Sequence, residues 1–154
     1  MARLEDIPEG ERKMMEALDC TGFEERLPWV TGPALSERRV AILSTAALSL
    51  RGDTGFTPTD GGFRVIPGDV APKDVVMGHV SSNFDRSGFQ RDINVCFPID
   101  RLRELAADGV IGSVSNFHFS VLGSRSPLEL EDSAREIARV LISDGVDTVL
   151  LVPV

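Results

Sequence analysis

The polar side chains that could do chemistry are concentrated in residues 78–92, GHVSSNFDRSGFQRD. This stretch contains His79, and the only other histidine of the chain is His118. Because histidine titrates near neutral pH, both are candidate general acid or base groups. The candidate substrate-binding residues are hydroxyl, amide and carboxylate side chains in or just after this region and at the end of an upstream strand: Ser44, Thr45, Ser81, Ser82, Asp85, Asp92 and Asn94.

Each candidate also has a structural explanation. Hydrogen bonding within the fold would account for either histidine, and Asp85 or Asp92 could cap a loop instead of receiving a substrate ammonium group. His79, His118, Asp85 and Asp92 would form a nitrogen and oxygen ligand set, so metal-assisted hydrolysis is an alternative. Long loops separate these residues in the sequence, and we therefore expect no metal.

The two cysteines do not have the features of catalytic thiols. Cys20 and Cys96 match no zinc or redox spacing, and Cys96 lies in the apolar context INVCF, which is typical of a packed residue. The chain also lacks a glycine-rich phosphate loop, a nucleophile elbow and a His-Glu-x-x-His helix. General catalytic motifs therefore identify no function.

Length and composition indicate one ordinary globular domain. The chain has 154 residues, of which 42% are hydrophobic and 26% charged. Its net charge of -8 argues against nucleic acid or an anionic membrane as a partner. Two free thiols, together with the absence of an apolar signal sequence or membrane span, predict a cytoplasmic protein.

Continuous apolar runs and helical periodicity predict the elements that position these residues. The runs at 39–44, RVAILS, and 147–152, DTVLLV, are typical of strands buried on both faces. Pro98 and Gly109 bracket one predicted helix, and Ser126-Pro127 is expected to open another that ends before Gly145. The remaining expectations are a helix in 8–19, strands at 63–66 and 75–80, an extended segment at 92–97 and a strand within 110–119.

These elements predict an α/β fold with a mostly parallel, three-layer sheet of Rossmann or flavodoxin type. We expect a single domain over 1–154, with a helix and connector in 1–38 and the α/β core in 39–154. Because the predicted buried strand at 147–152 is not followed by a further helix, the fold is expected to be incomplete at its C-terminus and to self-associate.

The run GHVSSNFDRSGFQRDINVCFPIDRLRELAADGVIGSVSNFHFSVLGS resembles the selenoprotein B family of glycine, sarcosine, betaine and D-proline reductases. The most specific part is the pattern D-x-N-x-x-[FY]-P-[IL]-D-R-L-[RK]-E-L, here residues 92–105. The upstream runs RVAILSTAAL and FRVIP are also similar, so the resemblance extends over residues 39–154.

The resemblance implies reductive cleavage of a carbon–nitrogen bond α to a carboxylate in a small amine substrate. It also implies a selenocysteine or cysteine nucleophile just after Val154, where a selenocysteine codon read as a stop would truncate the chain. The implied partners are a subunit carrying a pyruvoyl group, a dithiol or thioredoxin-type reductant, and further copies of the chain in a homo-oligomer. The alternative is a non-catalytic ligand-binding or assembly module on the same scaffold.

Overall fold

The computed structural model describes residues 3–17, 30–79, 85–123 and 125–154. The strands are β1 (Arg39–Ser44), β2 (Leu48–Leu50), β3 (Phe63–Pro67), β4 (Val75–Met77), β5 (Ser113–Val114), β6 (Phe117–Val121) and β7 (Thr148–Val152). The α-helices are α1 (Glu9–Glu16), α2 (Ser87–Arg91), α3 (Ile99–Ala107) and α4 (Glu131–Ser143). Short 3-10 helices are η1 (Leu4–Asp6), η2 (Leu35–Glu37), η3 (Pro72–Asp74) and η4 (Ile93–Val95).

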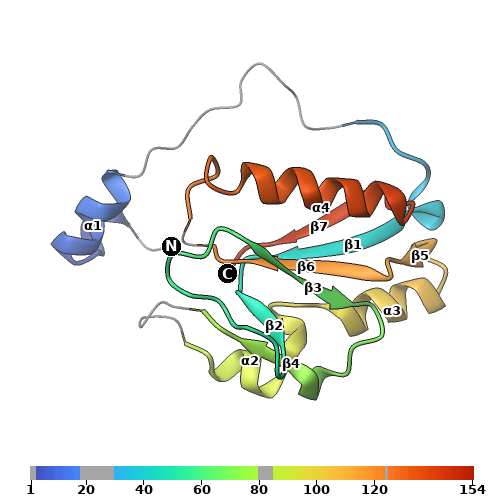
Figure 1. The fold of residues 1–154 in the computed structure, drawn as a ribbon, viewed down its shortest axis with the longest axis horizontal. Coiled ribbons are helices and arrows are strands. Elements are labelled where there is room, and N and C mark those ends of the chain that lie inside the picture. Colours follow the sequence, from blue (N-terminus) through green and yellow to red (C-terminus); the bar gives the residue numbers. More distant parts are fainter. Residues whose placement is uncertain (1–2, 18–29, 80–84, 124) are drawn as a thin grey trace.

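The main sheet is organised around β1, which has strands along both of its edges (Figure 1). β7 runs parallel to β1 along one edge, whereas β5 and β6 run parallel to the first and last residues of β1 along the other. β3 extends the sheet beyond β6 in the antiparallel direction. The sheet is therefore mixed but mostly parallel, and the predicted α/β class is confirmed.

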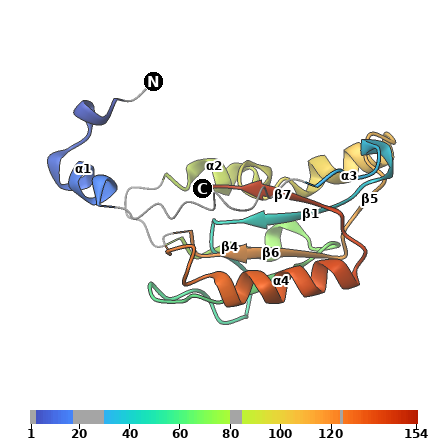
Figure 2. The same ribbon diagram turned by 90° about the horizontal axis from the view of Figure 1, so that it is seen from above.

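Helices cover both faces of this sheet (Figure 2). Val40 and Ile42 of β1 pack in the same apolar cluster as Leu102 of α3. The intervening residue Ala41 faces the opposite cluster, which includes Ile137 of α4. This alternation explains why β1 is a continuous apolar run, because each of its faces contributes to a separate core.

A second, two-stranded sheet begins where β1 ends. β2 pairs antiparallel with β4, and the connection from β1 to β2 passes through Ala47, which has a positive φ of 53°. The Ala47 amide donates to the Val121 carbonyl at the end of β6, and its carbonyl accepts from the Gly78 amide at 2.9 Å. These bonds connect the small sheet to the carboxyl ends of the main-sheet strands.

Several predicted elements match the structure in position and type. β1 has the predicted bounds, β3 and β4 lie at 63–67 and 75–77, and α3 begins directly after Pro98. The helix is followed by Gly109 in a left-handed conformation, φ 70°, as expected for a glycine that ends a helix. α1 occupies Glu9–Glu16 of the helix predicted in 8–19, of which residues 18–19 lie outside the described ranges.

Other predictions of local structure were wrong. The segment 92–97 is not extended but contains η4, because the Asp92 side chain accepts from the Asn94 amide and closes a turn. The strand expected within 110–119 is two strands, β5 and β6, separated by a turn. α4 begins at Glu131 and not at Pro127; the Ser126 amide does bond Glu129, but residues 127–130 form turns.

The prediction that 147–152 is fully buried was also wrong. β7 is a strand, yet Val149, Leu150 and Leu151 are 39%, 38% and 65% exposed. Within the described part of the chain β7 pairs only with β1, so its second edge has no strand beside it. A Rossmann or flavodoxin arrangement therefore stays a prediction, since the strand order includes an antiparallel member and an open edge at β7.

A charged cluster joins the amino ends of the strands. The Arg39 guanidinium contacts both carboxylate oxygens of Asp144 at 2.9 and 3.0 Å, and it donates to the Val114 carbonyl at 2.8 Å. Asp144 also accepts from the Ser115 hydroxyl and the Asn116 amide, at 2.7 and 2.9 Å. Its side chain is only 9% exposed. This carboxylate thus holds the end of α4, the start of β1 and the β5–β6 turn together.

We expect Asp144→Asn to lower the free energy of unfolding by about 3 kcal/mol, because the substitution leaves the Arg39 charge without its partner in a partly buried site. Urea denaturation measures this change. Glu131→Gln is the matched control, since it removes an exposed ion pair with Arg135 on the surface of α4. The control should leave the denaturation midpoint unchanged. An equal effect of the two substitutions would contradict a structural role for the Asp144 cluster.

Candidate functional site

The carboxyl ends of β1, β6 and β7 meet at one edge of the sheet, which we call the carboxyl edge (Figure 1). Thr45 is at its centre: its amide donates to the Val152 carbonyl, and its hydroxyl accepts from the Val154 amide at 2.8 Å. The Thr45 carbonyl accepts from the Gly123 amide at 3.1 Å. Such an edge is where open α/β sheets hold their ligands.

Close packing at this edge requires glycine after β6. A Cβ atom built on Gly123 would lie 2.7 Å from the Thr45 Cβ, a distance at which the backbone would have to move. The absence of a side chain therefore allows the ends of β1 and β6 to approach closely. The glycine that follows the mostly apolar run at 119–122 is the sequence signal that could have identified this position.

His79 reaches the same edge from the end of β4. It is buried, and its ring forms a hydrogen bond with the main chain of Val154. Burial and the nearby charge of Arg86 lower the pKa of His79 below its ordinary value, although the bond to Val154 acts in the opposite direction. His79 is therefore neutral at neutral pH. The structure brings His79 and Thr45 together through their shared contacts with Val154.

Arg86 is a member of this group that the sequence analysis missed. Its guanidinium donates to the His79 carbonyl, which ties the start of α2 to the end of β4. The neighbouring Asp85 accepts from the Ser87 amide and hydroxyl, at 2.8 and 3.0 Å, and these bonds lower the pKa of Asp85. Asp85 thus closes the turn before α2. Ser81 and Ser82 lie outside the described residues.

The polar residues of the motif at 92–105 form a chain of helix-capping bonds. Asp92 accepts from the amide and side chain of Asn94, at 2.9 and 2.7 Å. The Asn94 side-chain oxygen accepts from the Asp100 amide in the first turn of α3 at 3.0 Å. Asp100 pairs with Arg103 at 2.8 Å, and Arg103 donates to the Gly68 carbonyl. Asp92 and Asn94 are therefore engaged in positioning α3.

Ser44 is also occupied by the fold. It is fully buried, and its hydroxyl donates to the Cys96 carbonyl at 2.8 Å. Ser120 of β6 performs a related task, because its hydroxyl donates to the Ser44 carbonyl and accepts from the Leu48 amide. Burial raises the pKa of the Cys96 thiol to about 11, so this cysteine is protonated at neutral pH. Cys20 lies outside the described residues.

His118 lies inside the sheet, not at the carboxyl edge. Its Nδ1 accepts from the Ile42 amide at 2.9 Å, and its ring meets that of Phe97 edge-on with centroids 5.5 Å apart. Burial lowers the pKa of His118 to about 4, assisted by the charges of Arg103 and Arg39 and opposed by that of Asp144. Nε2 is buried without a partner among the described residues. This geometry gives a neutral imidazole that completes the hydrogen bonding of β1.

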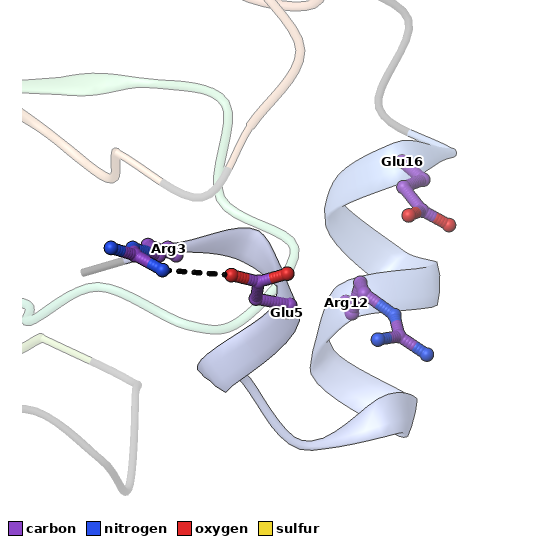
Figure 3. A pocket seen from close by; sticks show the side chains of 4 residues that line it. All are labelled: Arg3, Glu5, Arg12 and Glu16. Atoms are coloured by element: carbon purple, nitrogen blue, oxygen red, sulfur yellow. Dashed lines mark hydrogen bonds and ion pairs between the residues drawn. The ribbon is translucent and has the colours of Figure 1, made fainter.

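Two other features concern metal binding and a hollow on the surface. No three His, Cys, Asp or Glu residues are grouped for metal binding within residues 3–17, 30–79, 85–123 and 125–154. Figure 3 shows a hollow beside η1 and α1, lined by Arg3, Glu5, Arg12 and Glu16. Arg3 pairs with Glu5 at 3.3 Å, and both side chains are at least 70% exposed. An exposed surface pair of this kind contributes little to stability.

Replacing His118 tests its structural role. His118→Leu leaves the buried Ile42 amide without an acceptor, which should lower the free energy of unfolding by about 2 kcal/mol. His118→Asn is the matched control, since the asparagine side-chain oxygen can replace Nδ1 as the acceptor. It should lower the free energy of unfolding by less than His118→Leu does. Urea denaturation at pH 7 measures both changes. Equal losses of unfolding free energy in the two variants would contradict a structural role for the bond between the Ile42 amide and His118.

The pH dependence provides a second readout. Because the pKa of His118 is about 4 in the folded state and near 6.5 in the unfolded state, only the unfolded chain binds the proton between these values. The stability contribution of neutral His118 is complete above pH 6.5 and is lost as the pH falls toward 4. The difference in unfolding free energy between wild type and His118→Asn should therefore depend on pH in this window and be constant above it.

Comparison with known proteins identifies the family. Residues 73–154 match the family model described as glycine/sarcosine/betaine reductase selenoprotein B. The chain is 35% identical over 120 residues to "D-proline reductase subunit gamma" of Acetoanaerobium sticklandii, covering 76% of this chain and 49% of that protein. It is 30% identical over 73 residues to "Sarcosine reductase complex component B subunit beta" of Peptoclostridium acidaminophilum, covering 47% of this chain and 17% of that protein.

The chain thus spans about half the length, or less, of these curated relatives. No solved structure matches it. Among the described residues, no helix is both long and apolar enough to cross a membrane. The family match covers more than half of the chain and includes the capping motif, α3, β6, α4 and β7. The chain therefore belongs to the glycine/sarcosine/betaine reductase selenoprotein B family.

Proposed function

We propose that this chain is a subunit of a glycine-, betaine-, sarcosine- or D-proline-type reductase, and that it acts at the carboxyl edge. The reaction is reductive cleavage of the carbon–nitrogen bond α to a carboxylate. The observation that carries the proposal is the joint contact of His79 and Thr45 with Val154. It places a titratable group beside the end of β7, where the family resemblance puts the nucleophile.

The nucleophile is proposed to be a selenocysteine or cysteine that follows Val154. The attacking species in such chemistry is the anion, and a neutral imidazole can accept a proton from a thiol or, once charged, return one to the departing amine. The lowered pKa of His79 makes it neutral and ready for the first of these steps. The Thr45 hydroxyl fixes the position of Val154 and thereby of the residue that follows it.

Partner subunits are part of the proposal. The names of both relatives describe subunits of larger enzymes, a D-proline reductase and a sarcosine reductase complex. We propose a partner carrying a pyruvoyl group, which would activate the substrate amine, and a dithiol or thioredoxin-type reductant, which would supply the two electrons. The exposed apolar residues Val149, Leu150 and Leu151 of β7 are a surface that an assembled complex would cover.

The second candidate is a non-catalytic binding or assembly module. It is favoured by the number of candidate site residues that the fold already uses: Ser44, Asp92, Asn94 and His118 all make structural hydrogen bonds. On this reading the carboxyl edge holds a ligand or a neighbouring subunit. His79 then contributes hydrogen bonds and performs no proton transfer.

The test is a substrate panel on the native complex, captured from its source organism through a tag at Met1. D-proline, glycine, sarcosine and betaine are each supplied with dithiothreitol, and the cleaved product is quantified. We expect turnover of at least one substrate. His79→Asn should lower kcat by about 100-fold or more, which is the contribution of a general acid or base.

His118→Asn is the comparison that separates the two histidines. Because His118 lies in the sheet and bonds a backbone amide, its replacement should preserve kcat in a complex that assembles normally. Loss of turnover in His118→Asn with full activity in His79→Asn would reverse the assignment. A fully assembled complex that converts none of the four substrates would support the binding module.

A further inference from the structure

The Arg86 guanidinium is attached to the residue that carries the candidate acid or base. One of its terminal nitrogens donates to the His79 carbonyl. Burial, and after it the charge of Arg86, lowers the pKa of His79, so the cation acts on the imidazole as well as on the backbone. His79 in turn bonds the main chain of Val154, just after β7. A cation, a neutral imidazole and the end of a strand are therefore neighbours at the carboxyl edge.

Most of the donors of Arg86 are not used by the fold. A guanidinium carries N–H groups on all three of its nitrogens. Within the described part of the chain, the Arg86 side chain makes one hydrogen bond, to the His79 carbonyl. Arg86 is also exposed, so the remaining donors face solvent. They are available to a molecule that binds at this edge.

Arg86 also has no carboxylate partner among the described residues. The neighbouring Asp85 accepts instead from the amide and the hydroxyl of Ser87, at 2.8 and 3.0 Å. Other arginines are paired: Arg39 and Arg64 each contact an aspartate, at 2.9 and 2.6 Å. The chain has 24 acidic and 16 basic side chains, so a shortage of carboxylates does not explain the difference. The charge of Arg86 is thus left for an anion from outside this part of the chain.

The candidate substrates share one anion. Glycine, sarcosine, betaine and D-proline differ in the groups on nitrogen and in the side chain, but each carries a carboxylate on the α-carbon whose bond to nitrogen is cleaved. A group that binds the carboxylate therefore also fixes the position of the reacting bond. Arginine suits this task, because its planar fork of donors matches a carboxylate and its charge strengthens the hydrogen bonds.

We propose that Arg86 binds the substrate carboxylate through the N–H groups that are not bonded to His79. This inference rests on the proposed function, from which it takes a carboxylate-bearing amine as the substrate. The bond to the His79 carbonyl keeps the guanidinium beside the imidazole. A carboxylate on Arg86 accordingly brings the adjacent carbon–nitrogen bond to the group that is proposed to return a proton to the amine. Arg86 itself transfers no proton, since a guanidinium stays charged in proteins.

NMR of the full chain tests the carboxylate site without turnover. The chain has two histidines, so imidazole signals report His79 and His118 separately. A carboxylate on Arg86 offsets part of the charge that lowers the pKa of His79, and the His79 signals should therefore move toward their protonated positions at pH 7. Glycine, sarcosine, betaine and D-proline are each titrated at constant ionic strength. We expect a saturable change with at least one of them, and none with its amide, which lacks the carboxylate.

Variants of two arginines assign the change to Arg86. Arg86→Gln should abolish the saturable change at His79. Arg91→Gln is the matched control and should keep it, because Arg91 is an exposed arginine in the last turn of α2, which Arg86 precedes. The signals of His118, which is fully buried, should not respond in any variant. If Arg86→Gln fails to fold, Arg86→Lys provides the test: it keeps the charge but loses the fork, and should bind the same compound more weakly than wild type.

Kinetics of the native complex separate substrate binding from a purely structural role. Arg86→Gln should raise KM by about tenfold or more for each substrate that is converted, the loss expected when hydrogen bonds between a cation and a carboxylate are removed. It should change kcat by less. If Arg86 served only to hold His79 in place, the substitution would lower kcat and leave KM unchanged.

An unchanged His79 response in Arg86→Gln, or no response to any of the four compounds in wild type, would overturn the carboxylate site. Either result would leave the proposed function standing, because turnover is measured separately in the complex. A response that requires both the carboxylate and Arg86, together with a complex that converts none of the four compounds, would support the carboxylate site and reject the reductase assignment.

Discussion

The hydrogen bonds of β1 are the constraint on which the rest of this structure depends. β1 is buried on both faces and has strands on both edges, so each of its amide and carbonyl groups needs a partner within the protein. β5 and β6 together serve one edge but separate between Val114 and Phe117. At this separation the His118 ring accepts from the Ile42 amide, and Asp144 receives the Ser115 and Asn116 donors of the turn.

These structural hydrogen bonds involve most of the polar side chains that are buried in the described part of the chain. At the carboxyl edge, the Ser44 and Ser120 hydroxyls accept from the Ala46 and Leu48 amides of the β1–β2 connection, which passes through the positive φ of Ala47. A non-glycine residue in that conformation is retained only where its surroundings hold it, and such places often lie beside functional sites. What remains at this edge is Thr45 and His79, both directed to the end of β7.

Sequence reasoning succeeded where the cause of structure is local. Pro98 and Gly109 bound α3 because proline restricts its own φ angle and glycine can adopt a positive φ. The apolar run RVAILS indicates that β1 is buried on both faces. It failed at 92–97, where the apolar composition favours a strand but two short polar side chains close a turn. It could not distinguish His79 from His118, because the role of His118 depends on the register between β1 and β6. Apolar composition likewise predicts β7 as a strand without saying what covers it.

The capping bonds give the polar residues of the family motif a structural role. Asp92, Asn94, Asp100 and Arg103 form one continuous chain of bonds that orients α3 against the turn at Gly68. Each member is bonded to the next, and together they provide partners for donors at the start of the helix. The pattern is therefore specific because it builds a helix start. His79, by contrast, is found by following the strands to the edge where their carboxyl ends converge, since it contacts Val154 at the end of β7.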